Sequence, residues 1–253
     1  MNDIVTEIKN ASLGKTYLFY LGQAGFALKS KAGKLLAVDL YLSDCVSRYD
    51  GFKRLIPFML DPSEITFDYI IATHAHYDHF DPDSIPGLMG NPKTRLLASI
   101  GCECEIIKLG ISNSNITYVK VGDRFDYDDI KIQFVFCDHG VSAPDALGLI
   151  IEIDGKSIYI TGDTCLRLDK ANDIKCGQEI DIMITPINGT FGNLNEIDSI
   201  KLCKVVSPKL MIPCHFGCFA EQWGNPLKFA EEIKVRLPEQ MYAMMRFGEK
   251  MEI

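Results

Sequence analysis

The sequence lacks any long apolar run, since no segment approaches the ~20 uninterrupted apolar residues that a bilayer-spanning helix requires. Its first ten residues, MNDIVTEIKN, carry acids where a secretory signal peptide would carry a basic stretch followed by an apolar one. Both absences weigh against a membrane partner and against export. We therefore expect a cytoplasmic protein.

CxxC pairs and runs rich in lysine and arginine are absent as well. The nine cysteines are scattered and odd in number, which fits reduced thiols better than a disulfide framework. With a formal net charge of −8, the chain has no basic tract that would grip a phosphate backbone. We expect no nucleic-acid partner, and the composition leaves a homo-oligomer open.

What the sequence does contain is a succession of short β-branched and aromatic runs, which are typical of strands. They are TYLFY, GFALKS, KLLAVDL, DYIIAT, RLLAS, ITYV, IKIQFVF, LGLIIEI, SIYIT, DIMIT and KLMIP. Helical patterns are fewer and cover residues 82–89, 102–109, 196–206 and 227–235. Neighbouring strands come first and strands later alternate with helices. This order predicts an α/β (α+β) protein with two mixed β-sheets flanked by helices.

No linker rich in proline, glycine or serine and no low-complexity tract divides the 253 residues. We therefore predict a single domain over residues 1–253, long enough to bury a substantial core without cross-links. The longest stretch without clear periodicity, residues 41–64, is expected to be a long loop.

Five histidines occur in the chain, and three of them, His74, His76 and His79, fall close together around Asp78. Imidazole nitrogen and carboxylate oxygen are ligands that borderline divalent metals accept. His74 and His76 stand two apart at the end of the run DYIIAT, so in extended backbone both project to the same side. Asp78 and His79 follow where the chain turns toward the helix expected near Pro82. The cluster indicates two adjacent metal sites.

Three further candidate ligands each come just after a predicted strand, namely His139, Asp163 and His215. Loops that follow the carboxyl ends of strands commonly build binding sites. Taken alone, a histidine is more often an ordinary surface or core residue than a metal ligand. Asp163 taken alone is equally well explained as a turn residue that caps its own backbone. Joined to the cluster, the three supply the ligands that a site with only two histidines would lack. We therefore predict that the chain binds metal.

The segment Thr73–His79, THAHYDH, resembles the HxHxDH signature of the metallo-β-lactamase superfamily, and His139, Asp163 and His215 match its later ligand positions. The resemblance covers nearly the whole chain through the segments YLGQAGF, DLYLSD, PING and IPCH. Within the superfamily, the chain is most similar to the L-ascorbate-6-phosphate lactonase-like group of metal-dependent hydrolases.

This resemblance implies an αββα sandwich of the metallo-β-lactamase type, with two divalent metal ions at one edge between the sheets. The first ion would be held by His74, His76 and His139. The second would be held by Asp78, His79 and His215, and Asp163 would bridge the two.

On this hypothesis, a hydroxide shared by the two ions opens a lactone or ester, for example of a phosphorylated sugar acid. Asp78 would shuttle the proton of the attacking water, and Asp163 would keep the ions in register. Both are the predicted catalytic residues. The expected substrate is a small molecule, and the sequence assigns no substrate-binding residue.

Three other functions remain open at this point. Two metals also serve phosphodiester hydrolysis, and histidine with carboxylate ligands also suits a non-haem iron redox protein. A metal-dependent binding module would need a site without an open position for water. Because no thiolate is among the ligands, zinc and manganese are both expected, and iron is not excluded. Cys165 and Cys214, which adjoin candidate ligand positions, are predicted not to coordinate metal.

Several residues outside the ligand set have two readings. Asp39 would orient a ligand imidazole or would be merely a turn residue. Asn188 and Gly189 would line the cavity or would form a strand-to-loop turn. Three basic residues of the segment 41–64 would meet an anionic substrate group, although a solvated charged loop fits better: Arg48, Lys53 and Arg54.

Overall fold

A computed structural model describes residues 4–111, 113–171, 174 and 177–253 of the chain. Contacts divide the chain into two compact units, one of Met1–Lys120 with Arg246–Ile253 and the other of Val121–Met245. Each unit contains one seven-stranded mixed sheet, so the two mixed sheets expected from the sequence are confirmed. The single domain over residues 1–253 stays a prediction.

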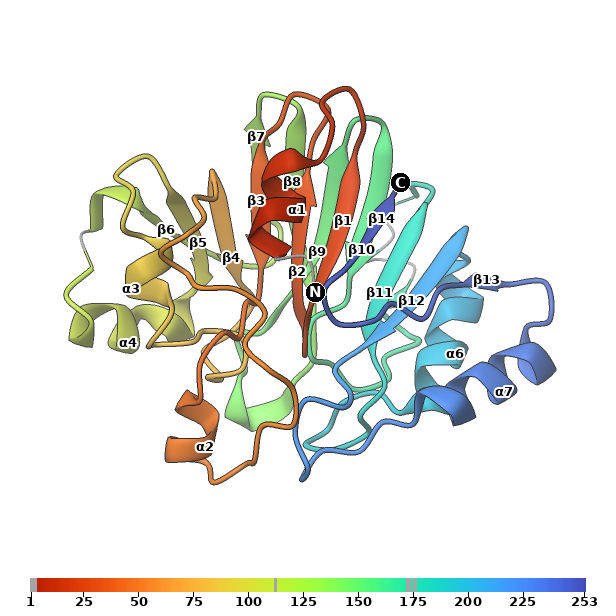
Figure 1. The fold of residues 1–253 in the computed structure, drawn as a ribbon. Helices are drawn as coiled ribbons and strands as arrows, with labels where there is room; N and C mark the ends of the chain where they lie inside the picture. The colour runs from red at the N-terminus through yellow and green to blue at the C-terminus, as the bar shows by residue number, and fades with distance from the viewer. Residues whose placement is uncertain (1–3, 112, 172–173, 175–176) are drawn as a thin grey trace. The chain divides into compact units, whose positions relative to one another are not determined.

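The sheet of the first unit has the strand order β14-β1-β2-β3-β4-β5-β6. Its strands are β1 (Tyr17–Gly22), β2 (Gly25–Lys29), β3 (Leu35–Val38), β4 (Tyr69–Ala72), β5 (Arg95–Ser99), β6 (Ile116–Val119) and β14 (Glu249–Glu252). The pairs from β14 to β3 are antiparallel, and the pairs from β3 to β6 are parallel. The last strand of the chain therefore pairs with the first (Figure 1).

The first unit also contains short helices and 3-10 turns. They are α1 (Ile4–Asn10), α2 (Cys45–Tyr49), α3 (Ile85–Leu88) and α4 (Glu103–Lys108), with the short 3-10 turns η1 (Ile100–Cys102) and η2 (Asn113–Asn115). α1, α3 and α4 bury apolar side chains in one cluster with alternate residues of β1 to β5. The intervening strand residues are also buried. Burial on both faces explains why these strands read as continuous apolar runs.

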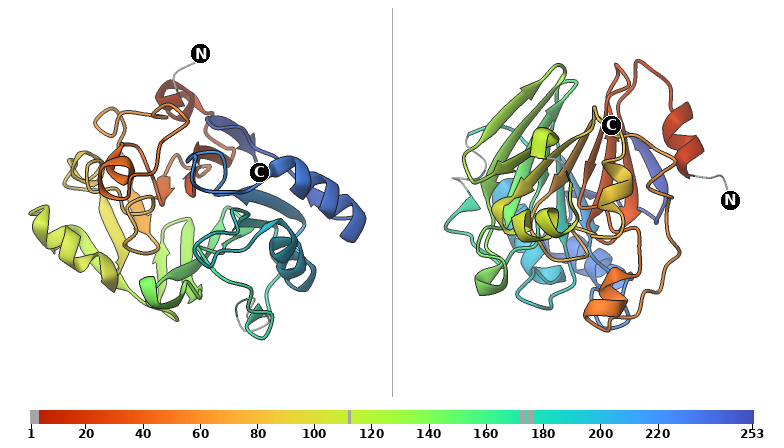
Figure 2. Two further views of the ribbon diagram at one scale, coloured as in Figure 1. Left: turned by 90° about the horizontal axis from the view of Figure 1, so that it is seen from below. Right: turned by 90° about the vertical axis from the view of Figure 1, so that its left-hand side faces the viewer.

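The sheet of the second unit has the order β13-β12-β11-β10-β9-β8-β7. Its strands are β7 (Arg124–Tyr127), β8 (Ile130–Phe136), β9 (Leu147–Ile153), β10 (Lys156–Ile160), β11 (Ile182–Pro186), β12 (Leu210–Cys214) and β13 (Met241–Tyr242). The second unit also contains the 3-10 turn η3 (Gly140–Ser142) and the helices α6 (Glu196–Val206) and α7 (Pro226–Arg236). α6 and α7 lie side by side in Figures 1 and 2 and share an apolar cluster with β11 and β12.

Both helices begin at an asparagine cap. The side chain of Asn195 accepts hydrogen bonds from two backbone N–H groups at the start of α6, and Asn225 does the same for α7. α6 ends at Ser207, which has a φ of 52°. Glu196 joins the two helices by accepting from the backbone of Asn225 and from Lys228 Nζ. The predicted helix over residues 196–206 is confirmed, and the one predicted over 227–235 lies within α7.

The sequence did not reveal the short elements α1, α2, β7, β13 and β14. The segment 41–64, expected to be a loop, contains the five-residue helix α2. Such elements are too short to develop a clear period, and neighbouring structure stabilises them instead.

In the second unit, three strands end at the same edge of the sheet. β8 and β10 are both antiparallel to β9, and β10, β11 and β12 are parallel. The carboxyl ends of β8, β10 and β12 therefore point the same way, and His139, Asp163 and His215 follow those ends.

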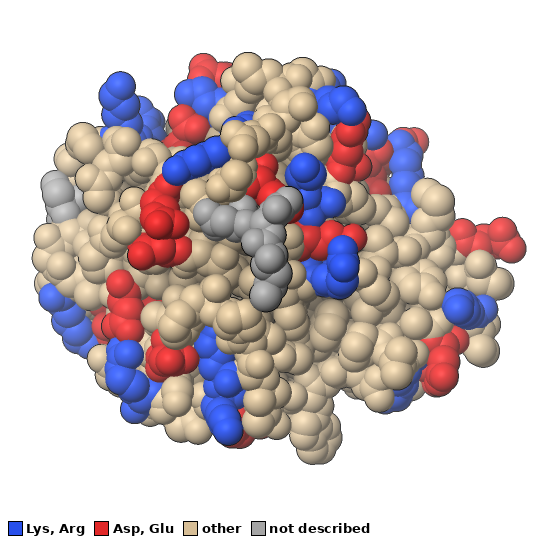
Figure 3. Space-filling model, viewed as in Figure 1, with Lys and Arg blue, Asp and Glu red and all other residues tan. Residues whose placement is uncertain are grey.

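Lysine and arginine side chains intermingle with aspartate and glutamate over the face drawn in Figure 3. On this face the charges form no single basic patch of the kind that grips nucleic acid. Among the described residues, none of the helices is long and apolar enough to cross a membrane.

A buried lysine fixes the end of α1 to the first sheet. Lys29, 6% exposed on β2, donates through Nζ to the carbonyl oxygens of Ile8 (2.8 Å), Lys9 (2.9 Å) and Ala11 (2.9 Å). The last carbonyls of a helix have no partner within the helix, so this ammonium satisfies them. Burial lowers the pKa of Lys29.

We predict that Lys29→Met lowers the free energy of unfolding by about 1.5–3 kcal/mol, because buried carbonyl groups lose a charged donor. Urea denaturation followed by circular dichroism measures the change. Lys93→Met, at an exposed position of the same unit, is the control. Equal unfolding midpoints for the Lys29 variant and the wild type would show that this contact does not anchor the helix.

Candidate metal centre

In the first unit, the four candidate ligands follow β4 on one loop. Backbone N–H groups of His79 (2.9 Å) and Phe80 (2.8 Å) both donate to the carbonyl of His76, which closes a tight turn. This turn brings Asp78 and His79 back toward His74, as the sequence predicted. His74 and His79 are fully buried, whereas His76 and Asp78 are partly exposed.

The ligand atoms of this loop converge in pairs. His74 Nε2 lies 3.0 Å from His76 Nδ1, and His79 Nε2 lies 3.7 Å from Asp78 Oδ2. The ring centroids of His74 and His79 are 4.1 Å apart. The first unit thus brings all four predicted residues together.

Asp39 fixes the hydrogen positions on two of these imidazoles. Its Oδ2 accepts from Thr73 Oγ1 (2.7 Å) and lies 2.8 Å from His79 Nδ1, and its Oδ1 accepts from Thr73 N (2.8 Å). An ionised carboxylate only accepts, so His79 carries its hydrogen on Nδ1. The Thr73 hydroxyl gives its one hydrogen to Asp39, so it accepts from His74 Nδ1 at 3.0 Å.

In the neutral imidazoles, both Nε2 atoms therefore present lone pairs, which is the state a metal requires. Asp39 is 1% exposed and follows β3. Of the two readings that the sequence allowed for Asp39, the structure supports the one in which it orients a histidine.

In the second unit, the three predicted residues meet at one carboxylate oxygen. Asp163 Oδ2 lies 3.1 Å from His215 Nε2 and 3.9 Å from His139 Nε2. Asn193 Nδ2 donates to the same oxygen at 2.7 Å. All three predicted side chains are buried. The second unit therefore gathers a histidine, a carboxylate and a second histidine from the ends of three strands.

The backbone beside Asp163 requires glycine. Gly162 has a φ of 65°, and a Cβ atom there would collide with the carbonyl oxygen of Leu147. The thiol of Cys137 donates to the carbonyl oxygen of Asp163 at 3.0 Å, which helps to fix the backbone of Asp163. His215 itself has a φ of 59°, in the left-handed region that histidine enters at an energetic cost.

Sequence reasoning missed four residues that hold the candidate ligands: Thr73, Gln23, Asn193 and Asp81. Thr73 and Asn193 act as described, and Gln23 Nε2 donates to Asp78 Oδ2 at 2.8 Å. Asp81 ties the ligand loop to the start of segment 41–64 by accepting from Leu42 N (2.9 Å) and Ser43 Oγ (2.7 Å). For all four, a sequence signal is lacking because their partners lie 30 to 55 residues away.

The basic residues of segment 41–64 have structural partners. Arg48 Nη2 donates to Asp83 at 2.6 Å. Arg54 donates to backbone carbonyls of Tyr41, Ser43 and other residues, and its guanidinium lies over the Tyr41 ring at 4.5 Å. Lys53 is exposed. For the two arginines the structure favours a role in ordering the loop.

Asn188 and Gly189 lie in a turn after β11. Asn188 forms a bridge with Asn195 and donates to Thr190 Oγ1 at 3.0 Å, and Gly189 has a φ of 64°. These contacts support the turn reading, and a cavity-lining role stays a prediction.

The cysteines lie outside the ligand groups. Among the eight that the structure describes, all are free, and none belongs to a described group that could hold a metal. Burial, followed by the Asp138 carboxylate, raises the pKa of Cys165, which keeps its thiol protonated and a poor ligand.

The spacing within each unit fits a metal ion. A tetrahedral zinc with Zn–N bonds of ~2.0–2.1 Å holds neighbouring ligand atoms roughly 3.3 Å apart. The nearest pairs measure 3.0 Å in the first unit and 3.1 Å in the second. Buried imidazoles with lone pairs on Nε2, joined by carboxylates, are a donor set suited to zinc or manganese.

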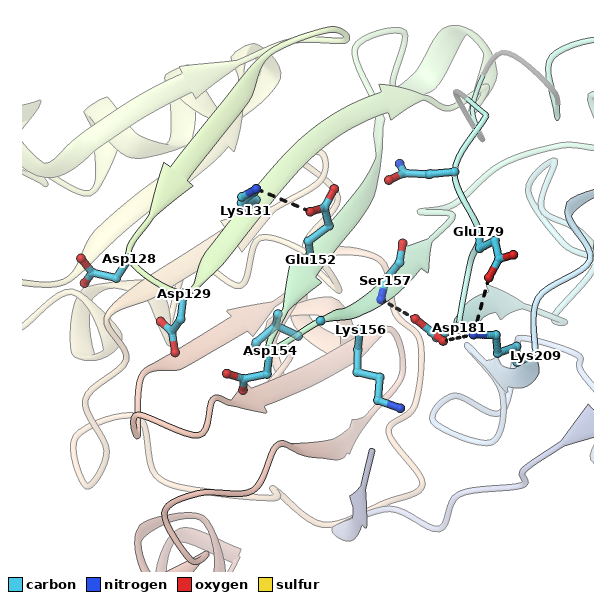
Figure 4. Close-up of a pocket in the computed structure, with 13 residues that line it drawn as sticks. Asp128, Asp129, Lys131, Glu152, Asp154, Lys156, Ser157, Glu179, Asp181 and Lys209 are labelled. Atoms are coloured by element: carbon cyan, nitrogen blue, oxygen red, sulfur yellow. Dashed lines mark hydrogen bonds and ion pairs between the residues drawn. The ribbon is translucent and has the colours of Figure 1, made fainter.

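A hollow in the second unit, shown in Figure 4, is lined by charged side chains and differs in character from the candidate metal centre. It lies near the amino ends of β10, β11 and β12, opposite the candidate ligands. Lys209 pairs there with Asp181 (2.8 Å) and Glu179 (3.7 Å), and Lys131 pairs with Glu152 (3.9 Å). Within each pair the positive and negative charges offset each other at the surface.

Comparison with known proteins gives concordant findings. Residues 17–215 match a family model described as a β-lactamase superfamily domain. A UPF0173 metal-dependent hydrolase of Sulfolobus acidocaldarius is 30% identical over 223 residues, which cover 87% of this chain and 92% of the relative.

Two solved structures share the fold. Igni18, a metallo hydrolase from the archaeon Ignicoccus hospitalis, has a TM-score of 0.73 at 20% identity, covering 94% of this chain and 98% of the other. An isothiocyanate hydrolase from Delia radicum gut bacteria has a TM-score of 0.71 at 20% identity, covering 93% and 98%. The predicted metallo-β-lactamase fold is confirmed.

We predict that Asp39→Asn weakens metal binding about 10–100-fold, the effect usual for a lost partner of a ligand histidine. An amide has only one acceptor oxygen. With its NH₂ group in place of Oδ2, His79 would have to carry its hydrogen on Nε2, and with the NH₂ group in place of Oδ1, the Thr73 N–H would lose its acceptor. Dissociation constants for zinc and manganese, measured by competition with a chelator, give the answer. Asp61→Asn, at an exposed position, is the matched control. Unchanged constants in the Asp39 variant would refute the orienting role.

Proposed function

This chain belongs to the β-lactamase superfamily and is a metal-dependent hydrolase, and we propose that it opens a small lactone or ester at a centre of two divalent ions. The observation that carries the proposal is the state of the buried histidines. Thr73 and Asp39 hold His74 and His79 so that Nε2 of each carries a lone pair. A carboxylate oxygen lies within 4 Å of Nε2 in His79, His139 and His215.

In this proposal, His74, His76 and His139 would hold the first ion, and Asp78, His79 and His215 would hold the second. Asp163 would be a ligand of both. The ligand spacing within each unit supports this assignment, as does the match of all seven residues to the family signature. Zinc and manganese both suit this set, which contains no thiolate.

Two divalent ions held by these residues would lower the pKa of a water and stabilise negative charge on a carbonyl oxygen. The chain's own residues perform the remaining tasks. Asp78 is partly exposed and held by Gln23, so it is placed to accept the proton of an attacking water. Asp163 is fixed by Asn193 and by the backbone at Gly162, which keeps its carboxylate rigid.

The engagement of two arginines in segment 41–64 supports one substrate class over another. Recognition of a phosphate usually needs a free arginine or lysine. Arg48 is bound to Asp83, and Arg54 is bound to backbone carbonyls. Burial and the nearby Asp78 raise the pKa of Asp50, an additional acid near the ligand loop. We therefore favour a neutral carbonyl substrate over a phosphodiester, and a phosphorylated sugar acid would have to be bound by residues other than these two arginines.

A phosphodiesterase is the second candidate, since two metals serve both reactions. The isothiocyanate hydrolase of the same fold adds a third electrophile to consider, because fold alone does not select the reaction. The described cysteines are all free, which fits the cytoplasmic location that we propose. The substrate that we propose is a small molecule.

We predict that chelation removes all hydrolytic activity and that zinc or manganese restores it. Metal-free protein reloaded with each ion is assayed on matched panels of lactones, carboxylic esters, phosphodiesters and isothiocyanates. The proposal expects the highest kcat/KM on a lactone or ester. Higher turnover of phosphodiesters would favour the second candidate, and activity that survives complete metal removal would contradict both.

We predict that Asp163→Asn reduces bound metal and abolishes hydrolysis while circular dichroism remains that of the wild type. The amide keeps the shape but loses the charge that two cations would share. Metal content is measured by elemental analysis. Asp126→Asn, on the exposed surface of β7, should retain both metal and activity. Full activity in the Asp163 variant would remove its bridging role.

A further inference from the structure

The segment YLGQAGF contains a buried polar side chain in an unusual conformation. Gln23 lies in the turn between β1 and β2, has a φ of 51° and is 1% exposed. A left-handed backbone is disfavoured for a long side chain, and asparagine or glycine would be the usual residue there. A strained conformation of this kind persists only when its surroundings hold it, and such residues gather at functional sites.

The backbone of this turn is fixed independently of the glutamine side chain. Tyr20 Oη donates to the carbonyl oxygen of Gln23 at 2.9 Å, and the Tyr20 ring stacks on Phe26 at 4.7 Å. A Cβ atom at Gly25 would approach the carbonyl oxygens of Gly22 and Asp39 at 3.0 and 3.2 Å. The turn is thus packed against the residue that orients His79, and it cannot shift without disturbing Asp39.

The side chain of Gln23 reaches the ligand loop from this rigid base. Its Nε2 donates to Asp78 Oδ2 at 2.8 Å, across 55 residues of sequence. A neutral amide holds the carboxylate in one orientation without neutralising it. A lysine or arginine in the same place would compete with a cation for the negative charge. The contact therefore suits a carboxylate that must stay fixed and charged.

We propose that Gln23 is a positioning residue for Asp78, which it holds in the orientation needed to bind the second metal ion and to accept a proton. The inference rests on the proposed dinuclear centre. Asp39 sets the histidines of the loop, and Gln23 sets its carboxylate. The two supports reach the loop from adjacent strands of one sheet.

Three variants test this inference. Gln23→Met keeps the length of the side chain but removes the donor. Gln23→Asn suits the left-handed turn at least as well as glutamine but ends one methylene short of Asp78. Gln178→Met, in the charged hollow of the second unit, is the matched control. For each variant we would measure the zinc and manganese dissociation constants of both metal equivalents. The unfolding midpoint of the metal-free protein, and kcat and KM at saturating metal, complete the comparison.

We expect both Gln23 variants to bind one of two metal equivalents about 10–100-fold more weakly, as for other lost partners of metal ligands. At saturating metal, kcat should fall more than KM changes. The metal-free Asn variant should unfold at or above the wild-type midpoint, and the Gln178 variant should match the wild type throughout.

If the wild type binds two ions and the Met variant binds both with the same dissociation constants, the role of Gln23 is refuted while the proposed centre stands. Full binding by the Asn variant would show that only the turn geometry matters and would overturn it as well. A wild type that binds fewer than two equivalents would instead overturn the proposed centre, and this inference with it.

Discussion

The hydrogen bonds of the Asp39 carboxylate are the constraint on which the candidate centre depends. One oxygen serves both His79 and, through Thr73, His74. Without this acceptor, either imidazole could carry its hydrogen on Nε2, and the buried nitrogens would have no fixed role. A buried carboxylate is costly unless its hydrogen bonds are satisfied, and here the bonds to Oδ2 also orient two proposed ligands. The interaction that makes Asp39 tolerable in the core therefore also prepares His74 and His79 for the proposed metal.

Sheet topology supplies the rest of the arrangement. In the second unit, the directions of β8, β10 and β12 bring the residues after them to one edge, where the Asp163 carboxylate meets two histidines. In the first unit, a tight turn after His76 performs the same task on a single loop. Positive φ angles at Gln23, Asp39 and His215 indicate where the backbone is strained to meet these positions. At these three buried residues, backbone strain therefore coincides with a proposed ligand or with the support of one.

The sequence predicted those parts that depend on local pattern. Runs such as LGLIIEI became strands because both faces are buried, and α6 has the predicted bounds because Asn195 caps it and Ser207 ends it. The HxHxDH spacing identified the loop because all four residues stand on one turn. Gln23, Thr73 and Asn193 escaped notice because their roles arise from partners distant in sequence, and no local pattern records such a contact. The sequence left two readings for Asp39, because the donors that select between them, Thr73 and His79, lie 34 and 40 residues away.

The central claim is that seven histidine and aspartate side chains hold two metal ions. Anomalous diffraction from crystals loaded with zinc or manganese tests it most directly. The expected result is two ordered metal peaks. One ion should lie within bonding distance of His74, His76 and His139, the other within bonding distance of Asp78, His79 and His215, and Asp163 should contact both. Absence of ordered metal, or a sulfur of Cys165 or Cys214 within bonding distance of an ion, would contradict it.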